Sequence, residues 1–163
     1  MKIDSNRVLV GLMAFVTNTV GEITVPNYYI GAWECDLYKI SLKGYDSEYE
    51  IKLSKADFKN DFDKKRSYYR SGEVNKHEII KEGKRVNRFY FVMPDGLVDL
   101  KEIPTYCGVI FFWEQNNELR YRTARGAKLL KKDPVSNEKY KHIAGNLCIK
   151  LRIAKAKVSK KRV

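Results

Sequence analysis

The sequence predicts a single α/β domain with a mixed central sheet flanked by helices. Helical and β-like patterns follow one another in the order helix, three strands, helix, strands, helix, which is typical of a sheet covered by helices. The chain has 163 residues, of which 44% are hydrophobic and 12% aromatic. This suits one ordinary hydrophobic core and is too short for two comfortable domains. We therefore expect one domain over 1–163.

The first part of the chain supplies a helix and three strands. Apolar residues at helical spacing predict a helix over 5–18, with Ser5 as its candidate cap. The apolar run inside it, 8–16, is far shorter than the roughly 20 residues that span a bilayer, so no membrane segment is expected. Alternating patterns then predict consecutive antiparallel strands at 22–30, 33–40 and 47–53.

The second part begins with another helix. Ser54 followed by Asp57 resembles a capping box and predicts a helix over about 55–65. The polar, basic and glycine-punctuated stretch at about 66–87 is expected to be mobile. Short apolar runs predict two buried strands and an edge hairpin strand, at 88–93, 107–113 and 118–124. Apolar residues at steps of three and four, beginning at Ile143, predict a closing helix in the basic C-terminal segment at about 137–163.

Charge and cysteine usage restrict the classes of partner and compartment. Lys and Arg number 32 against 20 Asp and Glu, a net charge of +12, which favours a polyanion such as nucleic acid or an anionic surface. A basic tail kept for solubility is the alternative explanation. The three cysteines are far apart, without the spacing of a disulfide framework or a zinc site. A reducing cytoplasm fits this usage.

The strand at 47–53 places charged residues on one of its faces. Side chains alternate along a strand, so Tyr49, Ile51 and Leu53 are expected to face the core. Glu48, Glu50 and Lys52 then share the opposite, open face. In the preceding strand Trp33, Cys35 and Leu37 form one expected set, and Glu34, Asp36 and Tyr38 the other. A hairpin about Lys43 or Gly44 brings Asp36 opposite Glu50 or Lys52.

Two carboxylates beside one ammonium group suit metal-assisted phosphodiester hydrolysis. Mg²⁺ takes oxygen ligands, usually one or two carboxylates with water and substrate phosphate. A nearby lysine can orient the attacking water or stabilise charge that develops on phosphorus. Two plainer explanations remain open. Opposite charges on a strand face also pair for sheet stability, and Glu-x-Lys arises by chance, as it does at Glu82 and Lys84.

The motifs "ECDLYKI" and "YEIKLSKADFKND" resemble the acid and E-x-K core of the PD-(D/E)XK nuclease superfamily. Together with "RFYFVMPDGLV" and "IPTYCGVIFF", they are similar to MmcB-like DNA-repair proteins and related small phage-encoded proteins, over about 22–132. The resemblance implies a restriction-endonuclease-like core. It also implies Asp36 and Glu50 as ligands of Mg²⁺ or Mn²⁺, and Lys52 as the catalytic lysine.

Further site residues are expected around this triad. Superfamily members often add an acid from the first helix, and Glu22 is the nearest substitute here, because that helix has no acid after Asp4. Asp57, Asp61 and Lys65 lie on or near one face of the following helix, although Asp57 can equally be a capping residue. His77 matches a Lys-His pair in the phage relatives and is expected either to contact phosphate or to be exposed, whereas His142 is expected to be structural.

Nucleic-acid contacts are expected mainly from the basic segment. Tyr68, Tyr69 and Arg70 combine aromatic rings with a cation, a common way to hold unpaired bases, although such rings can also fold back onto the sheet. Lys55 and Lys76 complete the expected DNA-binding set.

The leading hypothesis is a cytoplasmic Mg²⁺- or Mn²⁺-dependent deoxyribonuclease that acts in DNA repair, recombination or phage DNA processing. Its expected partner is DNA, single-stranded or branched forms included, and not a membrane. Its oligomeric state is left open, with a homodimer among the options. The alternative is a catalytically weak or inactive nuclease-like module that binds DNA and recruits other factors. A third hypothesis, an RNA-binding protein without catalysis, rests only on charge and aromatic content.

Overall fold

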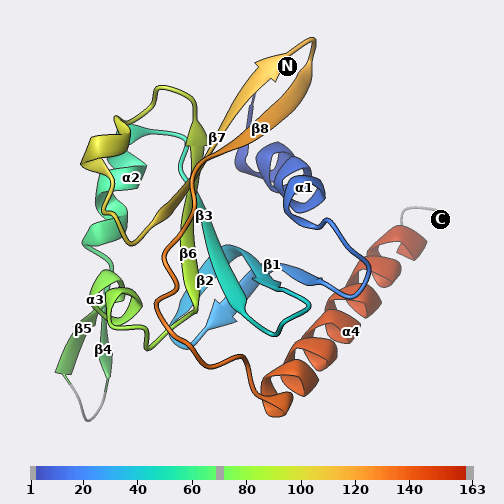
Figure 1. Cartoon of the computed structure of the whole chain (residues 1–163). Helices are drawn as coiled ribbons and strands as arrows, with labels where there is room; N and C mark the ends of the chain where they lie inside the picture. The colour runs from blue at the N-terminus through green and yellow to red at the C-terminus, as the bar shows by residue number, and fades with distance from the viewer. Residues whose placement is uncertain (1–2, 69–71, 161–163) are drawn as a thin grey trace.

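A six-stranded mixed sheet forms the centre of the fold, with helices on both of its faces (Figure 1). The computed structural model describes residues 3–68 and 72–160. The elements are α1 (Ser5–Val16), β1 (Ile23–Ile30), β2 (Trp33–Ile40), β3 (Asp46–Ile51), α2 (Lys55–Phe62), β4 (Lys65–Tyr68), β5 (Gly72–Asn75), α3 (Lys76–Lys81), β6 (Arg88–Pro94), the 3-10 turn η1 (Leu100–Glu102), β7 (Gly108–Gln115), β8 (Glu118–Arg125) and α4 (Asn137–Lys160). The expected single α/β domain with a helix-flanked mixed sheet is confirmed.

The strand order is β1-β2-β3-β6-β7-β8. β1, β2 and β3 form an antiparallel meander, as the sequence predicted. β3 pairs with β6 and β6 with β7 in parallel, and β8 returns antiparallel to β7. β3 therefore lies in the interior of the sheet, between β2 and β6. All six of its residues are buried, as expected for a strand that is covered on both faces.

The two faces of the sheet carry separate apolar clusters. On one face α1 packs Val8 and Leu12 against Leu37, Tyr49 and Ile51. The cluster on the other face contains residues of α2, α3 and α4 together with strand residues, among them Phe58, Ile80, Ile143, Phe89 and Phe91. Figure 1 shows α1 apart from α2 and α3, on the other side of the sheet. The burial of these apolar side chains from water is the main stabilising contribution to the domain.

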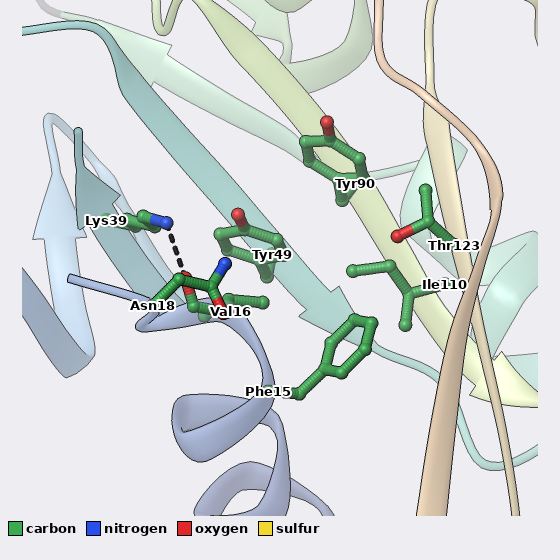
Figure 2. Close-up of a pocket in the computed structure, with 8 residues that line it drawn as sticks. All are labelled: Phe15, Val16, Asn18, Lys39, Tyr49, Tyr90, Ile110 and Thr123. Atoms are coloured by element: carbon green, nitrogen blue, oxygen red, sulfur yellow. Dashed lines mark hydrogen bonds between the residues drawn. The ribbon is translucent and has the colours of Figure 1, made fainter. Parts of the chain in front are cut away.

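A pocket of about 270 Å³ lies between the C-terminal end of α1 and the sheet (Figure 2). Tyr49 and Tyr90 stack there with ring centroids 5.0 Å apart. A Cβ at Gly108 would lie 2.3 Å from the Tyr90 ring and 2.8 Å from the Ala127 nitrogen. Only glycine at position 108 therefore lets the Tyr90 ring lie over β7 in this way.

Local capping sets the starts of the first two helices. Asp4, rather than the expected Ser5, caps α1, and its side chain accepts the Arg7 N–H at 2.8 Å. Ser54 caps α2 as predicted and accepts the Asp57 N–H at 3.1 Å. The helix ends at Phe62, earlier than expected, because the chain turns directly into β4.

The segment at 66–87, which the sequence predicts to be mobile, contains regular secondary structure in its described residues. β4 and β5 form a two-stranded hairpin, and α3 follows directly. Asn75 caps α3 by accepting the N–H groups of His77 and Glu78. Lys76 and Arg85 are buried, although their charge had suggested solvent exposure. The reason is that acids from β3, remote in sequence, neutralise them.

The predicted closing helix is present as α4, but its apolar stripe is only partly packed. Ile143 is fully buried and Leu147 is partly buried against the core cluster. Leu151 is 58% exposed, so the apolar packing does not continue along the stripe. No helix in the described ranges is long and apolar enough to cross a membrane.

Candidate active site

The site lies where β2 and β3 separate. The last paired residues of these strands are Leu37 and Tyr49, and one further step of this register sets Asp36 beside Glu50. The Asp36 Oδ2 accepts the Ile51 N–H at 2.7 Å. The Asp36 carboxylate thus accepts a hydrogen bond from a backbone N–H of β3, just beyond the last residue pair of β2 and β3. This local geometry brings Asp36 and Glu50 together, as the hairpin argument predicted.

The side-chain alternation in β2 is broken around Asp36. Cys35 belongs to the same core cluster as Tyr38, whereas Leu37 packs with α1 on the other face. The sequence had predicted Cys35 and Leu37 on one face, and that prediction is wrong. Asn27 on β1 lies opposite Asp36 in the register, adopts a positive φ of 48° and makes no strand pair. The irregularity in β1 therefore accompanies the change of face in β2.

The charged face of β3 is not open, which corrects a second expectation. Glu48, Glu50 and Lys52 are 0%, 3% and 2% exposed. They lie under α2 and α3, and their charges meet partners from those helices. Leu53 is exposed instead of buried, because β3 ends at Ile51 and the alternation stops there.

Lys52 joins two carboxylates from different elements. Its Nζ lies 3.1 Å from Glu50 Oε2 and 2.7 Å from Asp61 Oδ1. Asp61 is fully buried on α2. Lys64, which follows α2, contacts the same two oxygens, at 3.4 Å from Glu50 and 2.5 Å from Asp61. The Lys64 side chain is 36% exposed, against 3% for Lys52.

A second buried ion-pair group lies beneath the first. The Lys76 Nζ is 3.0 Å from Glu48 Oε1 and 2.5 Å from Glu50 Oε1. Arg85 forms an ion pair with Glu48 at 2.6 Å and also donates to the carbonyls of Ile30 and Trp33. Lys76 is fully buried, so the expectation that it contacts DNA at the surface is wrong.

His77 is also buried and connects the site to the loop before β7. Its Nε2 is 2.7 Å from Asp61 Oδ2, and its Nδ1 is 2.8 Å from the Tyr106 hydroxyl. The ring stacks near Phe91 and tilts against Phe62. The sequence placed His77 in a mobile basic loop, but aromatic packing and two hydrogen bonds fix it next to Asp61.

The carboxylates of the site have opposite electrostatic environments. Burial, followed by the charge of Glu50, raises the pKa of Asp36 to about 6. Burial also acts to raise the pKa of Asp61, but the hydrogen bond from His77 and the charges of Lys76 and Lys52 outweigh it and hold that pKa well below its usual range. For Glu50, burial is likewise outweighed, chiefly by Lys76, so its pKa is lowered.

The same balance keeps Lys52 protonated. Burial acts to lower the pKa of Lys52, but the charges of Glu50 and Asp61 outweigh it and raise the pKa above its usual range. Lys52 can therefore offer a positive charge and N–H donors, and it is not suited to accept a proton at neutral pH.

Asp36 and Glu50 are the two candidate ligands for a divalent ion, and three lysines of the chain already contact Glu50. Asp36 is partly exposed and has no basic side chain of the described residues within ion-pair distance. Asp36 and Glu50 together supply two carboxylates, the number that Mg²⁺ commonly uses alongside waters and phosphate. No group of three or more His, Cys, Asp or Glu side chains placed to hold a metal ion occurs in residues 3–68 and 72–160.

The remaining predicted acids differ in their distance from this centre. Asp57 is half-exposed and lies 3.8 Å from the Lys52 Nζ. Glu22 is remote: it pairs with Lys39 at 2.8 Å, next to the pocket of Figure 2. It precedes Ile23, which pairs with Ile40 at the far end of β2 from Asp36. Glu22 is therefore not a substitute ligand.

The predicted DNA contacts are only partly described. Lys55 is exposed at the start of α2. Lys65 is exposed on β4 and pairs with Glu73 at 3.3 Å. Tyr68 ends β4, and its side chain is not described. Tyr69 and Arg70 lie outside the described residues. A pocket of about 330 Å³ is lined by Tyr29, Trp33, Glu34, Lys64, Lys65 and Arg66.

Sequence reasoning missed three partners in the site, namely Lys64, Arg85 and Tyr106, and placed Glu48 on the face of Glu50 without giving it a role. Lys64 had one local signal, since it follows Asp61 by three residues, a spacing at which side chains meet. The other contacts depend on how distant segments pack, for which the sequence held no signal.

Comparison with known proteins supports the fold alone. No protein-family model and no curated protein matches the chain. Among solved structures, the SPO1766 protein of unknown function from Silicibacter pomeroyi is similar, with a TM-score of 0.59 and 17% identity. The alignment covers 93% of this chain and 94% of that one. The two proteins therefore share an architecture over nearly their whole length.

Proposed function

We propose that this protein is a Mg²⁺- or Mn²⁺-dependent nuclease of PD-(D/E)XK type that hydrolyses DNA phosphodiester bonds. Asp36 is the observation that carries the proposal. Asp36 lies one register step beyond the last β2–β3 pair, opposite Glu50, and forms no ion pair within 4 Å with a basic side chain of the described residues. Burial, followed by the charge of Glu50, raises its pKa to about 6. A cation bound between Asp36 and Glu50 would offset both the burial of the Asp36 carboxylate and its repulsion by Glu50. Perturbed carboxylates of this kind are concentrated at functional sites.

The chain's own residues divide the work of hydrolysis. When bound, the divalent ion would polarise a phosphoryl oxygen and make water a better nucleophile. Asp36 and Glu50 would hold it. Lys52, kept protonated by Glu50 and Asp61, would stabilise the negative charge that develops on the phosphoryl group. Asp61 fixes Lys52 at 2.7 Å and is itself held by His77.

Basic residues beside the site support a polyanionic substrate. Lys64, Lys65 and Arg66 line one pocket next to it, and the chain carries a net charge of +12. Phosphate contacts release counterions from DNA, so affinity should fall steeply as salt rises. These contacts bind the phosphate backbone of DNA and not the edges of its bases, so no sequence specificity is expected.

Cleavage of single-stranded, duplex and branched DNA in Mg²⁺ or Mn²⁺ tests the proposal. Wild type should cleave at least one of these substrates. Asp36→Asn, Glu50→Gln and Lys52→Met, each confirmed to be folded, should lose at least about a hundredfold in rate, as expected when a ligand or a charge-stabilising group is removed. Glu22→Gln is the matched control and should retain full activity. Absence of metal-dependent cleavage by wild type would refute the proposal.

A second candidate function is a nuclease-like module that binds DNA and recruits other factors without cutting. One observation favours it: Glu48, Glu50 and Asp61 each already form ion pairs with lysine or arginine from the chain itself. This module would bind DNA in EDTA as well as in Mg²⁺, and its affinity would be unchanged in Asp36→Asn. A filter-binding or polarisation assay with DNA and RNA probes distinguishes it from the nuclease.

A further inference from the structure

Two lysine ammonium groups contact the same pair of carboxylate oxygens in the candidate site. Lys52 and Lys64 both contact Glu50 Oε2 and Asp61 Oδ1, Lys52 at 3.1 and 2.7 Å and Lys64 at 3.4 and 2.5 Å. Lys52 is buried and satisfies both oxygens. Lys64 is therefore an additional positive charge, placed on the solvent side of the pair.

The charge of Lys64 acts on both proposed ligands of the ion, Asp36 and Glu50, and on Asp61 beside them. Lys64 forms no ion pair with Asp36 within 4 Å. Lys76, by contrast, contacts Glu50 from the buried side and is fully enclosed. Among the lysines that pair with Glu50, Lys64 is thus the one that reaches solvent.

The Lys64 side chain reaches solvent while its backbone is held by a hydrogen bond. The Lys64 carbonyl accepts the Lys76 N–H at 2.9 Å, which anchors the main chain. The side chain is 36% exposed and borders the basic pocket with Lys65 and Arg66. A displaced ammonium group would stay beside this pocket, where the phosphates of DNA could pair with it.

We propose that Lys64 is a tethered cation that competes with the divalent ion for the Glu50 carboxylate and moves away from it when the ion binds. The inference rests on the proposed metal site. Lys64 would hold the ion-free site electrically balanced and lower its affinity for the metal. Once displaced, the same side chain would contact the DNA backbone. Metal binding and DNA binding would in this way support each other.

Calorimetric titration of the full chain with Mn²⁺, without DNA, tests this competition. Lys64→Met should bind Mn²⁺ about three- to tenfold more tightly than wild type, a gain comparable to the loss of one partly exposed ion pair. Lys64→Arg keeps the charge and should bind as wild type does. Lys65→Met, which removes a neighbouring exposed lysine, is the control for net charge and should also match wild type.

Each outcome separates this inference from the proposed function. If Lys64→Met and wild type bind Mn²⁺ equally, or if Lys65→Met gains as much as Lys64→Met, the competition is refuted while the metal site stands. If Lys64→Met binds more tightly but no variant cleaves DNA, the competition stands and the nuclease is refuted. If neither wild type nor Lys64→Met binds Mn²⁺, both proposals are wrong.

Discussion

Replacing Asp36 with asparagine should stabilise the protein at alkaline pH while it removes the proposed metal ligand. Asparagine keeps an acceptor for the Ile51 N–H but carries no charge. The pKa of Asp36 rises from an ordinary value of 3.8 to about 6 in the folded protein. At about 1.4 kcal/mol for each pKa unit, ionised Asp36 costs about 3 kcal/mol of folding free energy, or about 2 kcal/mol once solvent screening at a partly exposed group is considered.

This cost has a definite pH dependence. An acid whose pKa is raised by folding begins to destabilise the folded protein above its unfolded pKa, 3.8 for Asp36, and the cost is complete only above the folded pKa of about 6. The cost diminishes as the pH falls through 6, and it is nearly gone at about 4, where the folded carboxyl is protonated. Asp36→Asn should therefore exceed wild type in unfolding free energy by about 2 kcal/mol at pH 8 and by about 0.5 kcal/mol or less at pH 4.

Urea unfolding of both proteins at pH 8 and pH 4, without divalent ions, measures this difference. Glu34→Gln, an exposed acid on the same strand, is the control and should change the unfolding free energy by less than about 0.5 kcal/mol at either pH. Equal stability of Asp36→Asn and wild type at pH 8, or a gain that persists at pH 4, would refute the electrostatic account of Asp36.

Two further substitutions test the interior. Lys76→Met should lower the unfolding free energy by about 3–5 kcal/mol, because it removes a positive charge that pairs with the buried carboxylates of Glu48 and Glu50. Urea unfolding measures this loss. A loss below about 1 kcal/mol would contradict the stabilising role of the buried ion pairs. Gly108→Ala should cost about 1–3 kcal/mol, since its Cβ would overlap the Tyr90 ring. An unchanged thermal midpoint would show that Tyr90 does not lie over Gly108.

The part of the site that local patterns determine was predictable from the sequence. Alternation in 47–53 and the turn near Gly44 placed Asp36 against Glu50, and the register agrees. The cap at Ser54 also followed from a local pattern. Such features depend on neighbours along the chain or on one hairpin, so a single sequence carries enough information to predict them.

The burial of the site depended on contacts that no local pattern records. A strand face that bears Glu48, Glu50 and Lys52 normally faces water, and only the approach of α2 and α3 covers it. Lys76 looked like a surface residue because its partners, Glu48 and Glu50, precede it by more than 25 positions. The change of face between Cys35 and Leu37 likewise depends on the backbone of β1, which their own strand pattern does not reveal.

The position of a bound divalent ion is the most direct test of the central claim, that Asp36 and Glu50 form a metal-dependent hydrolytic centre. Anomalous diffraction from crystals grown with Mn²⁺ would locate it. The account predicts one strong peak between the two carboxylates, within about 2.5 Å of an oxygen of each, with the Lys64 ammonium group moved away from Glu50. A fully occupied Mn²⁺ site elsewhere in the protein, or no ion beside Asp36 at millimolar Mn²⁺, would contradict the central claim.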